Sequence, residues 1–295
     1  MLKWSSYFQT PAFLEYTRAH MIPDDLKSTI LKQCRISPGS RVLDIGCGTG
    51  YLARLLKEAD ASLQITGVDT DDDFLSRAEE LSPDITFIRA DALSLPFKDN
   101  SFDAVVSHTF FTSISEPGQA LDEMRRICTP QGSVSAVVSM TFQPAVCPGF
   151  YPKDLPWLDE YNELHHKMWT MFETINPMKE YLGALSPEAL PHFLAAGGLK
   201  EITAYPIGRM FSLSNAALSP SDREQYLRLR ERAEREKLNA YLEFEAAQRL
   251  FSREMGDRYL ELLQQKFQFY RDHPQENQIW EWEGGASILL CGKNT

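Results

Sequence analysis

Hydrophobic positions follow two alternating patterns between residue 40 and about residue 140. Short runs rich in β-branched residues predict five strands, at residues 41–45, 63–69, 85–91, 102–108 and 132–139. Apolar residues at helical spacing predict helices between them, at residues 51–59, 72–81 and 117–128. Strands that alternate with helices in this way favour a parallel sheet with helices on both faces.

The pattern changes after residue 140. Prolines at positions 144, 148, 152 and 156 predict a loop that leads into an aromatic-rich helix at 157–175. A short helix, a glycine stop and a sixth strand are expected within 186–208. Residues 221–273 indicate a long, charged helical stretch, and residues 286–293 a last strand. We therefore expect an α/β fold with one doubly wound core that carries two helical insertions.

Charge and cysteine usage argue against several classes of protein. The 295 residues carry a formal net charge of -11, whereas a nonspecific nucleic-acid binder normally presents a basic face. The five cysteines are scattered without a C-x-x-C pair, which favours reduced thiols and a cytoplasmic location. No apolar run reaches 18 residues and the N-terminus lacks the layout of a signal peptide, so we expect no membrane association. Residues 11–20 instead indicate an amphipathic helix.

The stretch RVLDIGCGTG, at the end of the first strand, contains Gly46, Gly48 and Gly50. Glycines there permit positive φ and close backbone approach, and the start of the following helix favours negative charge. Dinucleotide-binding loops use G-x-G-x-x-G, whereas this loop reads G-x-G-x-G and follows Asp44. That carboxylate would repel a pyrophosphate but can accept a hydrogen bond from an ammonium group. The loop therefore indicates a ligand with an amino group, with a purely structural turn as the alternative.

Two further aspartates follow the next two strands. Asp69 ends the second strand, where a carboxylate typically accepts hydrogen bonds from the ribose hydroxyls. Asp91 follows the third strand, where it could accept from the exocyclic amine of an adenine while Ala92 offers a backbone donor. The neighbouring aspartates at 71–73 fit a solvated helix start better. Together the strand ends favour an amine-bearing nucleoside over a phosphate-rich ligand.

Four segments resemble the successive motifs of class I S-adenosylmethionine-dependent methyltransferases: VLDIGCGTG, GVDTDDDFL, RADALSLPFKDNSFDAVVS and RRICTPQGSVSAVV. The resemblance is close over residues 38–140 and looser in GGLKEITAYPI and the final strand. It implies a Rossmann-like, seven-stranded sheet whose last strand runs antiparallel. It also implies S-adenosyl-L-methionine as the cofactor and S-adenosyl-L-homocysteine as the product.

The same resemblance implies roles for individual residues. In that family the glycine loop and Asp44 hold the methionine part of the cofactor, Asp69 binds the ribose, and Asp91 with Ala92 flanks the adenine. Thr70 would border the adenosine, and His108, after the fourth strand, should face the methyl group. The cofactor-binding residues expected are Asp44, Gly46, Cys47, Gly48, Gly50, Asp69, Thr70, Asp91, Ala92 and His108.

The domain organisation expected from pattern and resemblance has six segments. They are an N-terminal helical cap (1–37), the cofactor-binding core (38–140), a helical insertion that forms a substrate lid (141–185), a continuation of the core (186–208), a long helical insertion (209–283) and the final core strand (284–295).

The segment SHTFFTSI after the fourth strand bears on the methyl acceptor. It lacks the [D/N]-P-P-[Y/F] motif of amino-directed nucleic-acid and glutamine methyltransferases of this fold. A Pro-Cys nucleophile for pyrimidine methylation is missing as well, since VCPG reverses the order. A small-molecule acceptor is therefore favoured. His108 is the candidate catalytic base, with packing or shaping of the cofactor site as the alternative.

Tyr161, His165 and Trp169 share one face of the helix predicted at 157–175. They could line the acceptor pocket as a lid, or form an aromatic face packed against the core. Tyr16 and His20 are further candidates for substrate binding, because N-terminal helices often cover the site in this family. No spacing of histidines and cysteines indicates a metal site.

The charged stretch 221–273 is interpreted as a solvated amphipathic helix. Its length suggests an arm across the substrate mouth or a dimerisation element, so a homodimer is one expectation. The function expected is in-line methyl transfer from S-adenosylmethionine to a small molecule. The alternatives are an RNA or protein methyltransferase, and a cofactor-binding protein of this fold without methyl transfer activity. The sequence leaves open which acceptor, and which of its atoms, is methylated.

Overall fold

The computed structural model describes residues 3–22, 24–139, 155–177, 185–208, 211–213, 218–273, 282–283 and 287–295. The chain divides into two compact units. The sheet unit comprises Thr17–Thr141, Glu180–Arg209 and Gly285–Thr295, and the helical unit comprises Met1–Tyr16, Phe142–Lys179 and Met210–Gly284. Most of the predicted proline-rich loop lies outside the described residues.

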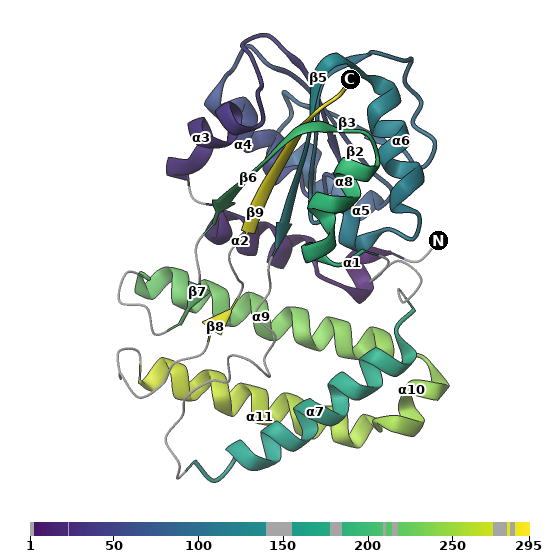
Figure 1. Ribbon diagram of the computed structural model, residues 1–295. Coiled ribbons are helices and arrows are strands. Elements are labelled where there is room, and N and C mark those ends of the chain that lie inside the picture. The colour runs from purple at the N-terminus through teal and green to yellow at the C-terminus, as the bar shows by residue number, and fades with distance from the viewer. Residues whose placement is uncertain are drawn as a thin grey trace. The chain divides into compact units, whose positions relative to one another are not determined.

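Within the described residues, the sheet unit is built on seven strands in the order β3-β2-β1-β4-β5-β9-β6 (Figure 1). They are β1 (Arg41–Ile45), β2 (Gln64–Asp69), β3 (Thr86–Arg89), β4 (Phe102–His108), β5 (Cys128–Ser139), β6 (Lys200–Ile207) and β9 (Ser287–Lys293). Strands β1 to β5 pair in parallel, and β9 runs antiparallel to both β5 and β6. The predicted Rossmann-like α/β sheet with an antiparallel last strand is confirmed.

Helices cover both faces of this sheet. They are η1 (Asp24–Leu26), α3 (Lys27–Gln33), α4 (Tyr51–Ala59), α5 (Asp72–Leu81), η2 (Phe111–Ser113), α6 (Pro117–Ile127), η3 (Pro187–Ala189) and α8 (Leu190–Ala196). Successive strand residues point to opposite faces, so each face has its own core. Leu43 and Val105 pack with the apolar residues of α6 and α8. Val42 and Val106 pack with those of α3 and α4 on the other face.

The helical unit packs its helices around a second apolar core. Its elements are α1 (Trp4–Tyr7), α7 (Leu158–Ile175), α9 (Pro220–Tyr241), α10 (Glu245–Leu250), α11 (Arg253–Asp272) and the paired strands β7 (Phe211–Ser212) and β8 (Trp282–Glu283). Met168, Leu227 and Tyr259 lie at the centre of that core. α2 (Pro11–Met21) begins in the helical unit and ends in the sheet unit. None of the helices in the described part of the chain is long and apolar enough to cross a bilayer.

The stretch 221–273 is not the solvated helix that its charge pattern predicted. Three helices share it, and between the second and the third Phe251 is extended and fully buried. Ser252 starts α11 by accepting a hydrogen bond from the Met255 amide at 3.2 Å. Leucines and tyrosines of α9 and α11 enter the same core as α7, so apolar burial determines the structure of this stretch. Its role as an arm or a dimerisation element stays a prediction.

Strand β5 begins at Cys128, four residues earlier than predicted, and its pairing with β4 shifts register after Phe102. A Cβ added to Gly132 in this irregular part would lie 2.7 Å from the backbone oxygen of Asp103 and 2.8 Å from that of Thr129. Backbone atoms held in a close-packed sheet have little room to move aside. The irregular first part of β5 therefore requires a residue as small as glycine at position 132.

Gly132→Ala should accordingly lower the free energy of unfolding by about 1–3 kcal/mol, because it forces atoms into a packed sheet. The urea midpoint of purified protein measures this change. Gly118→Ala is the matched control, since a Cβ there meets no atom within 4 Å. That variant should be neutral or more stable by up to about 1 kcal/mol, because alanine favours the helix more than glycine does. A Gly132→Ala protein with the wild-type midpoint would contradict the steric argument.

Candidate functional site

The turn from β1 into α4 holds three glycines in left-handed backbone conformations. Gly46, Gly48 and Gly50 have φ of 63°, 54° and 73°, which glycine adopts with little strain. Neighbouring rings also leave no room for side chains. A Cβ on Gly46 would lie 2.8 Å from Phe110 Cδ2, and one on Gly50 would lie 2.6 Å from Phe87 Cζ. The glycines therefore meet both a conformational and a steric requirement.

Asp44, near the end of β1, is a buried carboxyl group with incomplete hydrogen bonding. It is 1% exposed, and its Oδ2 accepts from the Ala53 amide at 3.2 Å. Among the described residues its Oδ1 has no hydrogen-bond partner. Burial raises the pKa of Asp44 to about 8; the Ala53 bond opposes this shift and the nearby Asp69 charge adds to it. A ligand N–H at Oδ1 would complete the site and favour the ionised form.

Asp69, the last residue of β2, is fixed by the same turn. Its Oδ2 accepts from the Gly48 amide at 2.9 Å and its Oδ1 from the Asp71 amide at 3.0 Å. Burial raises the pKa of Asp69 above its ordinary value, although the amides of Asp71, Gly48 and Thr70 favour the carboxylate. An ionised carboxylate has about four acceptor positions, so these amides leave acceptor capacity for a ligand. Partly exposed Thr70 follows, and buried Cys47 donates its amide to the Val68 carbonyl at 3.0 Å.

Asp91 and Ala92 follow β3, at the same edge of the sheet. The Ala90 amide donates to the Asp69 carbonyl at 3.0 Å, which joins the ends of β2 and β3. Asp91 is exposed, and its Oδ1 accepts from the Leu93 amide at 2.9 Å, whereas Ala92 is buried. This local bond is an Asx turn, which orients the carboxylate beside the strand end.

His108 ends β4, the strand on the other side of β1. It is 9% exposed, and its Nε2 has no hydrogen-bond partner within the described ranges. Burial, followed by the positive charge of Arg18, holds the pKa of His108 well below 6.5. The ring is therefore neutral at pH 7, and it can exchange one hydrogen bond with a ligand but holds an added proton poorly.

Arg18, on α2, is a residue of this site that the sequence pattern did not reveal. Its Nη2 donates to Thr109 Oγ1 at 2.9 Å, and that hydroxyl donates to the His108 carbonyl at 2.7 Å. Burial lowers the pKa of Arg18 to about 10, so the guanidinium stays charged at pH 7. An arginine on a short amphipathic helix normally lies on the face exposed to solvent, so the sequence did not mark Arg18 as a site residue. Only the packing of α2 places this one beside His108.

The predicted acceptor residues of the N-terminal segment fall in different units. Tyr16 belongs to the helical unit, where its hydroxyl donates to the Asp222 carbonyl at 2.6 Å. Burial and then the Asp222 charge raise the pKa of Tyr16. His20, partly exposed, lies one turn further along α2 in the sheet unit. Binding of an acceptor by either residue stays a prediction.

Helix α7 brings Tyr161, His165 and Trp169 together. The rings of Tyr161 and His165 stack with centroids 5.6 Å apart, and Trp169 Nε1 donates to His165 Nε2 at 2.9 Å. Tyr161 is buried and also stacks on Tyr259 at 5.7 Å, whereas Trp169 is 40% exposed. Tyr161 is thus a core residue of the helical unit, while His165 and Trp169 are reachable from solvent. Their role toward a substrate is not settled by this packing and stays a prediction.

The sheet unit therefore gathers the predicted cofactor residues at the carboxyl ends of four adjacent strands. The residues fit an amino-acid-bearing nucleoside in three respects. The glycine turn leaves room for close approach, Asp44 keeps a buried oxygen for an N–H donor, and His108 keeps a buried ring nitrogen. The described residues hold no cluster of three histidine, cysteine or acidic side chains that could bind a metal ion.

Two family models match the chain. Residues 43–136 match a model described as a methyltransferase domain, and residues 2–82 match the model of protein-L-isoaspartate(D-aspartate) O-methyltransferases. The first match spans the glycine turn and the strand ends that follow it, through most of β5.

Named methyltransferases are similar to part of the chain. The demethylmenaquinone methyltransferase of Renibacterium salmoninarum is 42% identical over 97 residues, which is 33% of this chain and 40% of that protein. The 2-phytyl-1,4-naphtoquinone methyltransferase of Nostoc punctiforme is 29% identical over 164 residues, or 53% of this chain and 64% of that protein. The chain thus covers less than two thirds of the length of either relative.

A solved structure agrees with the fold. The phosphoethanolamine N-methyltransferase 2 of Haemonchus contortus, in complex with phosphomonomethylethanolamine and S-adenosylhomocysteine, superposes with a TM-score of 0.51 and 20% identity. The superposition covers 98% of this chain and 59% of that protein. The ordered motifs, the strand order and the family match lead to one conclusion: residues 43–136 form a methyltransferase domain of the class I S-adenosylmethionine-dependent type.

Proposed function

We propose that the protein transfers a methyl group from S-adenosylmethionine to a small-molecule acceptor. The observation that carries this proposal is the group of strand-end carboxyls, Asp44, Asp69 and Asp91, around a glycine turn inside the matched methyltransferase domain. Such a set suits amines and hydroxyls and repels phosphates. S-adenosylmethionine carries an ammonium, two ribose hydroxyls and an adenine amine, so each carboxyl has a complementary group.

Each of these side chains then meets a different part of the cofactor. Asp69 accepts the ribose hydroxyls, and Asp44 Oδ1 accepts from the ammonium group. Asp91 accepts from the adenine amine while the Ala92 amide donates to the ring. Arg18 supplies the positive charge that complements a carboxylate. These assignments use Asp44 Oδ1, which has no partner among the described residues, and the positive charge of Arg18.

S-adenosylmethionine, when bound, supplies a methyl group on a positively charged sulfur that a nucleophile can attack in line. The chain's own contribution is to fix both ends of that molecule, so that the methyl group is held in one place. His108 accepts a proton poorly, because the resulting imidazolium would be buried beside Arg18. We therefore assign His108 to hydrogen bonding and shaping of the site and not to general-base catalysis.

The acceptor is proposed to be a small molecule. The acidic total charge and the missing amide-binding motif support this over RNA or protein. Two relatives are named for methylating quinone-type molecules, so a reduced naphthoquinone is the first acceptor to test. The proposed acceptor-binding residues stay Tyr16, His20, Tyr161, His165 and Trp169. A cytoplasmic location is part of the same proposal, as is a homodimer through the long helical insertion.

Asp69→Asn should raise the Kd for S-adenosylhomocysteine at least about tenfold, because an amide NH₂ replaces one acceptor oxygen facing the ribose. Isothermal calorimetry measures the Kd. Asp103→Asn is the matched control: Asp103 lies at the opposite edge of the same sheet, paired with Arg41 at 2.8 Å, and its Kd should equal that of the wild type. Wild-type protein that binds no S-adenosylhomocysteine, or an Asp69→Asn variant that binds normally, would contradict the assignment.

Binding should also release a proton at pH 7. The pKa of about 8 leaves about nine-tenths of Asp44 protonated in the free protein. The ammonium of S-adenosylhomocysteine favours the carboxylate, so close to one proton leaves and affinity rises between pH 6 and pH 8. Calorimetry in two buffers of different ionisation enthalpy counts that proton. Asp44→Asn should remove both effects; a wild-type protein that releases no proton would refute the placement of the ammonium.

Turnover separates the proposed function from its alternatives. Purified protein with S-adenosylmethionine should form S-adenosylhomocysteine when given a small acceptor such as a reduced naphthoquinone, as followed by chromatography. Transfer RNA and an isoaspartyl peptide should give no product above background. Product formed only with RNA or peptide would favour a macromolecular acceptor. Tight S-adenosylhomocysteine binding without turnover on a broad panel of small molecules would favour a cofactor-binding protein.

A further inference from the structure

One face of α6 holds the segment that follows Asp91 and Ala92. The Arg126 guanidinium donates to the Phe97 carbonyl at 2.8 Å, to the Leu95 carbonyl at 3.2 Å and to Asp99 Oδ1 at 2.9 Å. These acceptors belong to one loop and span five residues of it. Because the guanidinium is planar and rigid, its donors fix the relative positions of the groups they bind.

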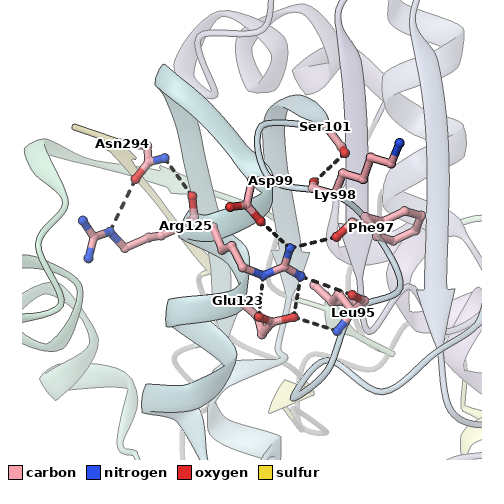
Figure 2. A network of polar contacts seen from close by, with 9 residues as sticks. Leu95, Phe97, Lys98, Asp99, Ser101, Glu123, Arg125 and Asn294 are labelled. Atoms are coloured by element: carbon pink, nitrogen blue, oxygen red, sulfur yellow. Dashed lines mark hydrogen bonds and ion pairs between the residues drawn. The ribbon is translucent and has the colours of Figure 1, made fainter.

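Glu123 completes this contact from one turn earlier on the helix. Its carboxylate accepts from Arg126 at 2.7 and 2.8 Å, a bidentate pair. The same carboxylate accepts from the Leu95 amide at 2.7 Å, and Gln119 donates to the Leu93 carbonyl at 2.9 Å. The polar face of α6 thus binds backbone groups at Leu93, Leu95 and Phe97. Figure 2 shows Leu95, Phe97, Asp99 and Glu123 gathered in one network of polar contacts.

The helix that makes these contacts is itself fixed to the sheet. Its apolar face is buried through Ala120, Leu121, Met124 and Ile127. At its end, Asn294 donates to the carbonyls of Arg125 at 2.9 Å and Cys128 at 3.0 Å, as Figure 2 shows for Arg125. The position of α6 is therefore set by the sheet and not by its contacts with the loop.

The apolar side of the loop is held as well. Leu95 and Ala92 are buried, and the ring of Phe97 meets that of Phe102 edge-on at 5.0 Å. The Glu123–Arg126 pair is partly exposed, with side chains 19% and 31% accessible, so its charge attraction contributes little to stability. Its effect is on geometry, because it satisfies several loop backbone groups at once.

We propose that Arg126 and Glu123 are positioning residues that set the place of Asp91 and Ala92 and thereby select adenine. This inference rests on the proposed function. A carboxylate held at the strand end accepts from the 6-amino group of adenine and repels the 6-oxo group of hypoxanthine. If the loop were released from α6, the Asp91 carboxylate would no longer be held in one place at the strand end, and the choice between these two bases would weaken. The Asp44 and Asp69 contacts would be unchanged.

The test compares S-adenosylhomocysteine with S-inosylhomocysteine, in which an oxo group replaces the adenine amine. Calorimetry should show that wild-type protein prefers the adenosyl compound by roughly tenfold or more. Arg126→Gln should reduce this ratio of dissociation constants at least about threefold. A general loss of stability would weaken both ligands equally and leave the ratio unchanged. Arg77→Gln is the matched control, because Arg77 forms the same kind of helical pair with Glu80 at 2.9 Å on α5.

A second variant covers the case in which Arg126→Gln fails to fold. Gln119→Ala removes one exposed donor to the loop and should reduce the ratio in the same direction by a smaller factor. Wild-type protein that binds neither compound would overturn the proposed function. The inference alone would be overturned if the wild-type protein prefers the adenosyl over the inosyl compound and the folded Arg126→Gln or Gln119→Ala variants show the same ratio of dissociation constants.

Discussion

Two carboxyl groups, the buried Asp44 and the partly buried Asp69, lie close to one another at the glycine turn, and the rest of the site depends on how the chain accommodates them. Burial penalises both charges; the charge of Asp69 adds to the penalty on Asp44, and the charge of Asp71 adds to the penalty on Asp69. Backbone amides of Ala53, Gly48 and Asp71 offset part of that penalty by donating to the carboxyl oxygens. The Gly48 amide can point at Asp69 because the turn adopts positive φ there, which explains why glycine is needed.

Two buried polar atoms of the site keep their capacity to form hydrogen bonds with a ligand. Asp44 retains a buried oxygen and His108 a buried nitrogen for which the described residues provide no partner. Buried polar groups are normally satisfied, so groups left open at one edge of a sheet indicate where a ligand supplies the missing bonds. Arg18 adds a partly buried positive charge beside His108, which balances part of the acidic character of the strand ends.

The two units differ in the kinds of groups that they present. The sheet unit contributes short strands whose ends are fixed by backbone pairing, and rigid strand ends suit recognition of one invariant molecule. The helical unit contains an aromatic core in which Tyr161 and Tyr259 are buried. Some of its charges pair along single helices, as Arg232 does with Glu236, which contributes little to stability. The match to the methyltransferase-domain model lies within the sheet unit, so the chemistry of this unit is better defined than that of the helical unit.

The sequence by itself determined the positions of the core strands along the chain, the glycine turn and the acids at the strand ends. These features are local: period-two burial, helical spacing and glycine conformation are set by residues a few positions apart. Tertiary structure decided what lies far apart in the chain. Arg18 binds Thr109, next to His108, across 91 positions, and Arg126 holds a loop that precedes its helix. The prediction of a solvated helix at 221–273 was wrong for the same reason. The charges of this stretch are visible in the sequence, whereas the α7 residues that its apolar side chains contact are far away in the chain. Which faces meet depends on the packing of whole elements, and a linear pattern of polar and apolar residues does not specify that choice.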